Sequence, residues 1–194
     1  MARQAARDSP AACCDPAAPR FVGRPLSMKA LAAGVLLLLA LSARAEIPAS
    51  YAPVVVRAQP DTAVERVFDL TPAFDRARER RQPLLVYVGA AECPPCRQYT
   101  QFLRDHESDL RPLFSKVVLV DVRTSIRGPR PTFVFDGHRY STLEFKSAIG
   151  NTHPGLSYPT WWLISPQGKQ LRQLPRGVDP FLDVENYVHW LAGF

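Results

Sequence analysis

The chain has 194 residues, 46% of them hydrophobic, a net charge of +6 and four cysteines. This length suits one ordinary domain with a hydrophobic core and some excess at one end. Six basic and two acidic residues lie within residues 1–45, so the net charge of the rest is only +2 and gives no sign of a nucleic-acid surface.

The N-terminal excess has the layout of a secretory signal peptide. An apolar run, Ala30–Leu41, follows Met28 and a lysine, and small residues then lead to Ala45. This pattern predicts cleavage before Glu46, with translation starting at Met28. The 12-residue run is shorter than the roughly 20 residues that a membrane span needs, so an uncleaved anchor is the alternative. We therefore expect residues 1–45 to be an N-terminal extension and signal peptide, and the mature chain to have no membrane span.

After cleavage, residues 46–63 form an extended lead-in with one β-like run at Val54–Val56, and a folded domain occupies residues 64–194. Thr71 is expected to cap a helix with Pro72 in its first turn, which continues to about Arg81. Leu84–Val88 is a continuous apolar run of strand length, as in a central strand that is covered on both faces.

The sequence AECPPCRQY follows that strand and holds the two mature cysteines, Cys93 and Cys96. Apolar residues then recur on one helical face between Arg97 and Leu110, with His106 among them. Val117–Val120 is a second strand. A strand, a long helix and a strand form a βαβ unit, in which the two strands are parallel.

Residues 123–140 are an insertion, within which Asp136-Gly137 predicts a hairpin turn. A short helix over 141–149 is expected to end at Gly150. Two antiparallel strands follow, and Trp161 and Trp162 should point to opposite faces of the first of them.

A final helix closes the chain, with Asp179 as its cap and Pro180 at its first position. The expected buried stripe of this helix consists of Phe181, Val184, Val188 and Leu191. Tyr187 and Trp190 are also interpreted as packing residues.

A CxxC pair at a strand-to-helix junction favours redox chemistry. Unpaired backbone N–H groups and the helix dipole stabilise an anion there, and such cysteines have pKa values of about 3.5 to 7.5. Cys93 is therefore the candidate nucleophile and Cys96 the resolving thiol. Pro94 and Pro95 occupy the first turn, where a missing N–H is tolerated. The flanking charges oppose each other, because Glu92 disfavours a thiolate and Arg97 favours it.

With Tyr158-Pro159-Thr160 placed just before an apolar strand, and with the closing strand, strand and helix, the chain resembles the thioredoxin-like family from about Val64 to Phe194. The resemblance implies an α/β fold with a central four- or five-stranded mixed sheet and helices on both faces. It further implies that Pro159 is cis and packs against the cysteine pair, and that the backbone at Tyr158 pairs with the substrate.

The sequence departs from the thioredoxin pattern in three places. Glu92 replaces a tryptophan, and Tyr87 replaces a buried aspartate that serves as acid and base; a tyrosine with an ordinary pKa of about 10 is a poor base near neutrality. The third departure is the insertion at 123–140, which is expected to leave the sheet at the same edge as the cysteine loop. We hypothesise that it forms a lip that restricts or recruits the substrate; a solvated insertion is the alternative.

Two other readings of the cysteine pair stay open. Copper(I) suits two thiolates, although His106, His138, His153 and His189 supply no partner at a short ligand spacing. An inert structural disulfide is disfavoured because so short a loop removes little chain entropy.

The sequence thus predicts a periplasmic thiol-disulfide oxidoreductase with a Cys93-Cys96 redox disulfide and no further cofactor. Its expected partners are protein thiols or disulfides, together with a membrane or soluble redox protein for recycling. The sequence leaves the reductase, oxidase and isomerase directions open, as well as the oligomeric state.

Overall fold

A computed structural model describes residues 45–59 and 65–194 of the chain. The predicted signal peptide, apart from Ala45, and the predicted start at Met28 lie outside the described residues. Within the described part, no helix is both long and apolar enough to cross a membrane.

The core of the domain is a five-stranded mixed sheet with the strand order β1-β4-β3-β7-β8. Its strands are β1 (Val54–Arg57), β3 (Leu84–Ala90), β4 (Val118–Thr124), β7 (Thr160–Ile164) and β8 (Gln170–Arg172). The strands β1, β4 and β3 are parallel to one another. The strand β7 runs antiparallel to β3, and β8 runs antiparallel to β7. The predicted βαβ unit and the mixed sheet are therefore confirmed, and the edge strand β1 comes from the segment expected to be a lead-in.

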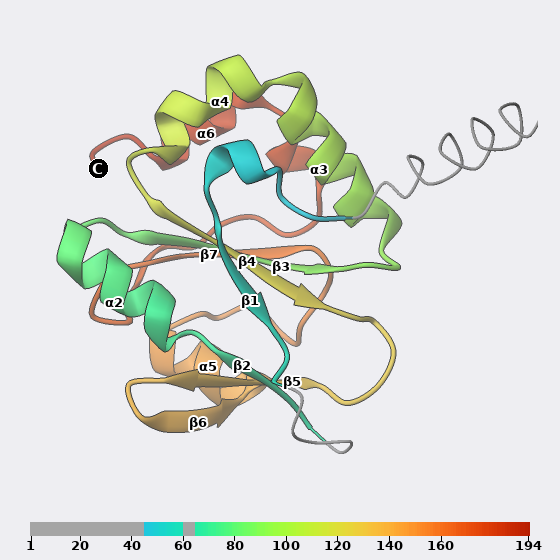
Figure 1. Cartoon of the computed structure of the whole chain (residues 1–194), viewed down its shortest axis with the longest axis vertical. Helices are drawn as coiled ribbons and strands as arrows, with labels where there is room; N and C mark the ends of the chain where they lie inside the picture. Colours follow the sequence, from blue (N-terminus) through green and yellow to red (C-terminus); the bar gives the residue numbers. More distant parts are fainter. Residues whose placement is uncertain (1–44, 60–64) are drawn as a thin grey trace, which may run out of the picture. The chain divides into compact units, whose positions relative to one another are not determined.

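Helices cover both faces of this sheet, as predicted (Figure 1). One face carries α3 (Pro94–Asp105), α4 (Glu107–Phe114) and α6 (Val184–Trp190), together with the short 3₁₀ helices η1 (Ala49–Tyr51) and η2 (Asp179–Phe181). The other face carries α2 (Thr71–Arg80) and α5 (Thr142–Ile149), and a second sheet of β2 (Arg66–Asp69), β5 (Pro131–Phe135) and β6 (His138–Ser141).

The strand β3 is buried along its whole length and separates two cores. Leu85 and Tyr87 point into the core beneath α3, α4 and α6, while Val86 and Val88 point into the core beneath α2 and α5. The two tryptophans divide in the same way, since Trp161 belongs to the first core and Trp162 to the second. The predicted alternation is confirmed, and both side chains are packing residues.

The segment expected to be an insertion is an integral part of the fold. Its hairpin is confirmed, with β5 and β6 antiparallel and with Asp136 and Gly137 at positive φ in the turn. However, β5 also pairs in parallel with β2, a strand that the sequence did not indicate, and the Phe133 ring is fully buried. Apart from the two-residue turn of the hairpin, residues 125–130 are the part of this segment that lies outside strands, as a loop between β4 and β5.

Three helix predictions were wrong in detail. The helix expected over Arg97–Leu110 is two helices, and the break between them falls at His106. The His106 side chain is 43% exposed and not a core residue, and the acidic first turn of α4 favours a new helix start there. Thr71 is the first residue of α2 and not its cap. Leu70 occupies the N-cap position and makes no side-chain cap, and the Asp69 carboxylate accepts the Thr71 N–H, 2.9 Å away.

The C-terminal helix also begins later than predicted. Asp179 and Pro180 start a 3₁₀ turn, and Asp183 caps α6 by accepting the Glu185 N–H at 2.9 Å. Val188 is 52% exposed, so the predicted stripe is wrong at that position. Tyr187 and Trp190 fill the core instead, as their interpretation as packing residues requires. Tertiary packing of these aromatic rings, rather than the aliphatic period, sets the buried face.

Candidate active site

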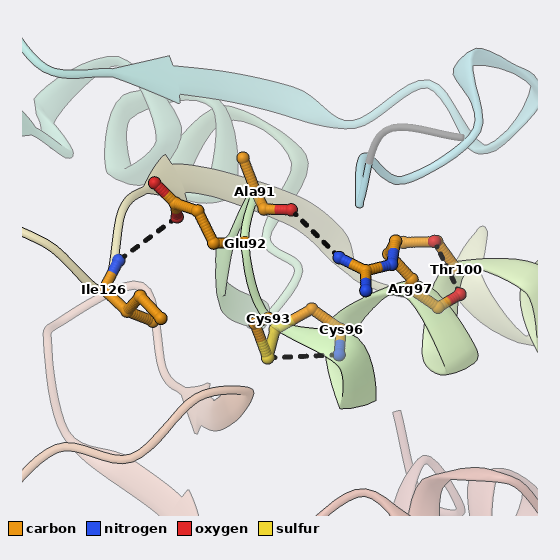
Figure 2. Close-up of a disulfide and its surroundings, with 7 residues drawn as sticks. All are labelled: Ala91, Glu92, Cys93, Cys96, Arg97, Thr100 and Ile126. Carbon is orange, nitrogen blue, oxygen red and sulfur yellow. Dashed lines mark hydrogen bonds between the residues drawn. A yellow bond between two sulfur atoms is a disulfide. The ribbon is translucent and has the colours of Figure 1, made fainter. Parts of the chain in front are cut away.

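Cys93 and Cys96 lie at the N-terminal end of α3, within disulfide-bonding distance of each other and with their Cα atoms 5.2 Å apart (Figure 2). Cys93 is the N-cap residue of α3, so its backbone is extended while that of the next residue is already helical. Cys93 is 4% exposed, and Cys96 is completely buried. Of the two sulfur atoms, that of Cys93 is therefore the one within reach of another molecule.

Two prolines determine which backbone group meets the Cys93 sulfur. Pro94 and Pro95 occupy the first two positions of α3 and have no N–H, so the first donor of the helix is the N–H of Cys96. This N–H donates to Cys93 Sγ across 3.2 Å. A helix N-terminus and an aligned N–H both favour a negative charge on the sulfur, so the loop is built to stabilise a Cys93 thiolate once the pair is reduced.

The two charged neighbours of the pair turn away from the sulfur atoms (Figure 2). The Glu92 carboxylate accepts hydrogen bonds from the Ser125 hydroxyl (2.6 Å) and the Ile126 N–H (3.3 Å), and the Ser125 contact is the main cause that lowers the pKa of Glu92. The Arg97 guanidinium reaches the Ala91 carbonyl at 3.5 Å. Glu92 is therefore an ionised anchor for the loop after β4, and neither charge contacts a cysteine.

The register of the sheet brings the Tyr158-Pro159-Thr160 segment beside the cysteine loop. Thr160 pairs with Val88, and β7 runs antiparallel to β3, so residues before Thr160 lie next to residues after Val88. The Tyr158–Pro159 peptide bond is cis, Pro159 is buried and Tyr158 is half-buried. Burial raises the pKa of Tyr158 despite the nearby Thr124 hydroxyl and Arg66 guanidinium.

Tyr87 lies below the cysteine loop, in the core that contains Cys96. Its ring packs against those of Tyr99, at 5.0 Å between centroids, and Trp161, at 5.8 Å. Its hydroxyl has no hydrogen-bond partner among the described residues. The hydroxyl oxygen lies only 2.4 Å from the position that a Cβ on residue 89 would take, so the glycine there leaves room for the ring. Burial raises the pKa of Tyr87 far above its ordinary value, so Tyr87 is neutral and serves as no general base.

A buried carboxylate that sequence reasoning missed lies directly beside Tyr87. Asp121 pairs with Tyr87 in the β3–β4 register and is fully buried. Its Oδ2 accepts hydrogen bonds from Arg123 Nε (2.8 Å) and the Ile47 N–H (3.3 Å), whereas Oδ1 has no partner within residues 45–59 and 65–194. Burial raises the pKa of Asp121, and the Arg123 charge opposes that rise. The available signal was an acidic residue inside the apolar run VVLVDV.

Comparison with known proteins identifies the family. A model of the thioredoxin-like domain matches residues 70–189, which is more than half of the chain. The chain belongs to the thioredoxin-like family. A search of curated proteins finds no match.

The thioredoxin-like domain thus brings together the CPPC loop, its two charged neighbours and the segment around Pro159, while Tyr87 lies in the core below them. No group of three or more histidine, cysteine, aspartate or glutamate side chains is placed to hold a metal ion within residues 45–59 and 65–194. The partners of Glu92, namely Ser125 and Ile126, had no recognisable sequence signal, because they lie 33 and 34 residues away in a loop.

Proposed function

We propose that this thioredoxin-like protein is an exported thiol-disulfide oxidoreductase that exchanges disulfides through Cys93 and Cys96 in the periplasm. The observation that carries the proposal is the hydrogen bond from the Cys96 N–H to Cys93 Sγ at the N-terminus of α3. A purely structural disulfide has no need for an anion-stabilising donor at one of its sulfur atoms. A nucleophilic thiolate does need one.

In the reducing direction, the Cys93 thiolate attacks one sulfur of a substrate disulfide. A Cys93–substrate disulfide forms, and the second substrate sulfur leaves as a thiolate that takes up a proton. Cys96, after loss of its proton, attacks Cys93 Sγ and releases the first substrate sulfur. Two electrons pass to the substrate, which becomes a dithiol, and the protein is left with the Cys93–Cys96 disulfide. In the oxidising direction the same steps run backwards.

Recycling requires a second redox protein, either a membrane protein or a soluble one, that carries a dithiol or a disulfide. The relative potentials of the two pairs set the direction of exchange. No cofactor other than the cysteine pair takes part. The predicted signal peptide supports the periplasmic location, where disulfides persist.

Trapping with Cys96→Ala tests the proposal. This variant retains the attacking thiol and lacks the resolving one, so mixed disulfides with substrates accumulate on Cys93 in the periplasm of the native cell. Non-reducing gels followed by mass spectrometry identify the partners. The matched control is the Cys93→Ala/Cys96→Ala double variant, which should trap none. Equal labelling of the two variants, or no mixed disulfide with Cys96→Ala, contradicts the proposal.

A further inference from the structure

A groove of about 240 Å³ opens beside the cysteine loop. Its walls come from β2, the loop after β4, the start of α5 and the segment that precedes β7. Tyr158 lines one end of it, next to Pro159. Ile126 lines another part, and its N–H donates to Glu92, the residue before Cys93. A chain segment lying in the groove would therefore run close to the cysteine pair. Figure 2 shows Ile126 on the far side of Glu92 from Arg97, with Cys93 following Glu92.

The groove is positively charged. Arg66 and Arg130 line it, and none of the described residues that line it is acidic. Arg66 donates to the Ser125 carbonyl (2.7 Å), the Thr124 hydroxyl (3.1 Å) and the Pro129 carbonyl (2.8 Å). All these acceptors are neutral, so the hydrogen bonds fix the position of the guanidinium without compensating its charge.

A buried lysine adds to this positive charge. The Lys146 ammonium donates to the carbonyl groups of His153 and Gly155, and Gly155 lines the groove. Lys146 is 4% exposed, has no carboxylate partner within the described residues and does not itself line the groove, so its charge acts from behind the wall that Gly155 forms. A fixed positive charge in a partly desolvated recess attracts an anion more strongly than a solvated surface charge does.

The rim of the groove is apolar. Ile126 and Leu143 lie on it and are 53% and 54% exposed, and the half-buried Leu156 continues the apolar surface inward. Exposed aliphatic side chains around a charged recess fit a peptide that has an aliphatic residue next to an acidic one.

We propose that the groove binds an acidic segment of the protein substrate, with an aspartate or glutamate near Arg66 and Arg130 and an aliphatic residue against Ile126 and Leu143, while the adjacent substrate cysteine reacts with Cys93. This inference rests on the proposed function and names the substrate class of the same site. Within the segment 123–140, it assigns substrate contact to the loop residues 125–130, because the hairpin that follows them is packed into the fold.

The test uses Cys96→Ala protein and synthetic peptides whose single cysteine is activated as a mixed disulfide with thionitrobenzoate. Cys93 attacks the peptide sulfur and releases the coloured thionitrobenzoate anion, which reports the rate. Three peptides carry glutamate, glutamine or lysine two to four residues from the cysteine on either side, with leucine next to each. Each rate is divided by the rate with mercaptoethanol, which removes the intrinsic reactivity of the peptide. We expect the glutamate peptide to react on the order of tenfold faster than the lysine peptide at low salt, and the preference to shrink at high salt.

Charge reversal in the groove provides the second arm. Arg130 is exposed and makes no hydrogen bond or ion pair within the described residues, so Arg130→Glu should fold, and it should reverse or abolish the preference. Arg130→Gln should give an intermediate result. The matched control is Arg80→Glu, an equal charge change on the last turn of α2. Arg80 precedes the start of β3, whereas the groove lies beyond the carboxyl ends of β3 and β4, so this variant should keep the wild-type preference.

The outcomes separate the two proposals. Equal normalised rates for the three peptides overturn the acidic-substrate inference and leave the exchange function intact. A preference that Arg80→Glu removes as fully as Arg130→Glu also overturns the inference, because net charge would then explain it. If no peptide releases thionitrobenzoate with the protein but all do so with mercaptoethanol, the proposed function itself fails.

Discussion

The two cores on either side of the central sheet differ in chemistry. The core beneath α2 and α5 contains hydrocarbon and aromatic side chains such as Val86, Phe133 and Trp162, and the buried polar groups on α5, those of Thr142 and Lys146, both have hydrogen-bond partners. The core beneath α3, α4 and α6 holds the cysteine pair, and it also contains Tyr87 beside the Asp121 carboxylate, each with a buried oxygen that lacks a partner within the described residues. A buried polar atom without a partner lowers the free energy of unfolding. The core that holds the cysteine pair therefore stabilises the domain less than an equally large apolar core would.

The largest expected effect is on exchange activity. Cys93→Ser should reduce the rate of disulfide exchange by at least about 10³-fold, because a hydroxyl is a far weaker nucleophile than a thiolate near neutrality. The measurement is reduction of a peptide disulfide by the reduced protein, with unfolding by urea as the control for the fold. Residual activity above a tenth of the wild-type rate would contradict the assignment of Cys93.

On the apolar side, Phe133→Ala should lower the free energy of unfolding by about 3 to 5 kcal/mol, since it empties a fully buried site between the two sheets. Urea unfolding measures this loss. In the fraction that stays folded, the rate of exchange should be close to the wild-type rate. A loss of activity without a loss of stability would show that the two cores are not divided as described.

Gly89→Ala probes the polar side. Its Cβ would meet the Tyr87 hydroxyl at 2.4 Å and the Tyr87 ring at 2.5 Å, so the buried ring must move. We expect a loss of about 1 to 3 kcal/mol in the free energy of unfolding, as for other overpacked cores. In the Tyr87→Val background, Gly89→Ala should lower the free energy of unfolding by much less than it does in the wild type, and a double-mutant cycle measures this difference. Additive effects of the two substitutions would contradict the contact.

Asp121 gives the polar core a pH dependence. Burial raises the pKa of Asp121, so the folded protein binds this proton more tightly than the unfolded chain does. This carboxyl group therefore makes the free energy of unfolding fall as pH rises from about 3.9, the ordinary aspartate value, through the raised pKa. Relative to wild type, Asp121→Asn should become more stable as pH rises from 4 to 7. A constant difference across this range would count against the raised pKa.

The smallest expected effect is that of Glu92→Gln. The Glu92 carboxylate is exposed and is held by Ser125 and Ile126, away from the sulfur atoms. Its removal should lower the pH midpoint of Cys93 alkylation by roughly 0.2 to 0.5 of a pH unit, and added salt should reduce the shift. A shift above one unit would mean that Glu92 contacts the thiolate in the reduced protein.

Much of the fold could be predicted from the sequence because local signals carried it. The apolar run at Leu84–Val88 predicted the central strand, and Asp136-Gly137 predicted the hairpin. The strand β2 was missed because its pairing with β5 joins segments that lie far apart in the sequence. The break at His106 was missed because the apolar period continues across it, although Glu107 and Asp109 in the first turn of α4 favour a new helix start.

The candidate site likewise has parts that the sequence predicted and parts that it did not. Cys93 and its two prolines are local in sequence, so their place at a helix N-terminus could be inferred. The anchoring of Glu92 by Ser125, and the pairing of Asp121 with Tyr87, depend on contacts between segments more than 30 residues apart. Only the register of the folded sheet reveals such contacts.

The most direct test of the central claim is the reduction potential of the Cys93–Cys96 pair in the folded protein. Equilibration with glutathione buffers of graded ratio, followed by alkylation of free thiols and mass spectrometry, measures it. An exchange enzyme should show one reversible two-electron transition between about −270 and −120 mV. A pair that stays oxidised below about −300 mV, as structural disulfides do, would contradict the account.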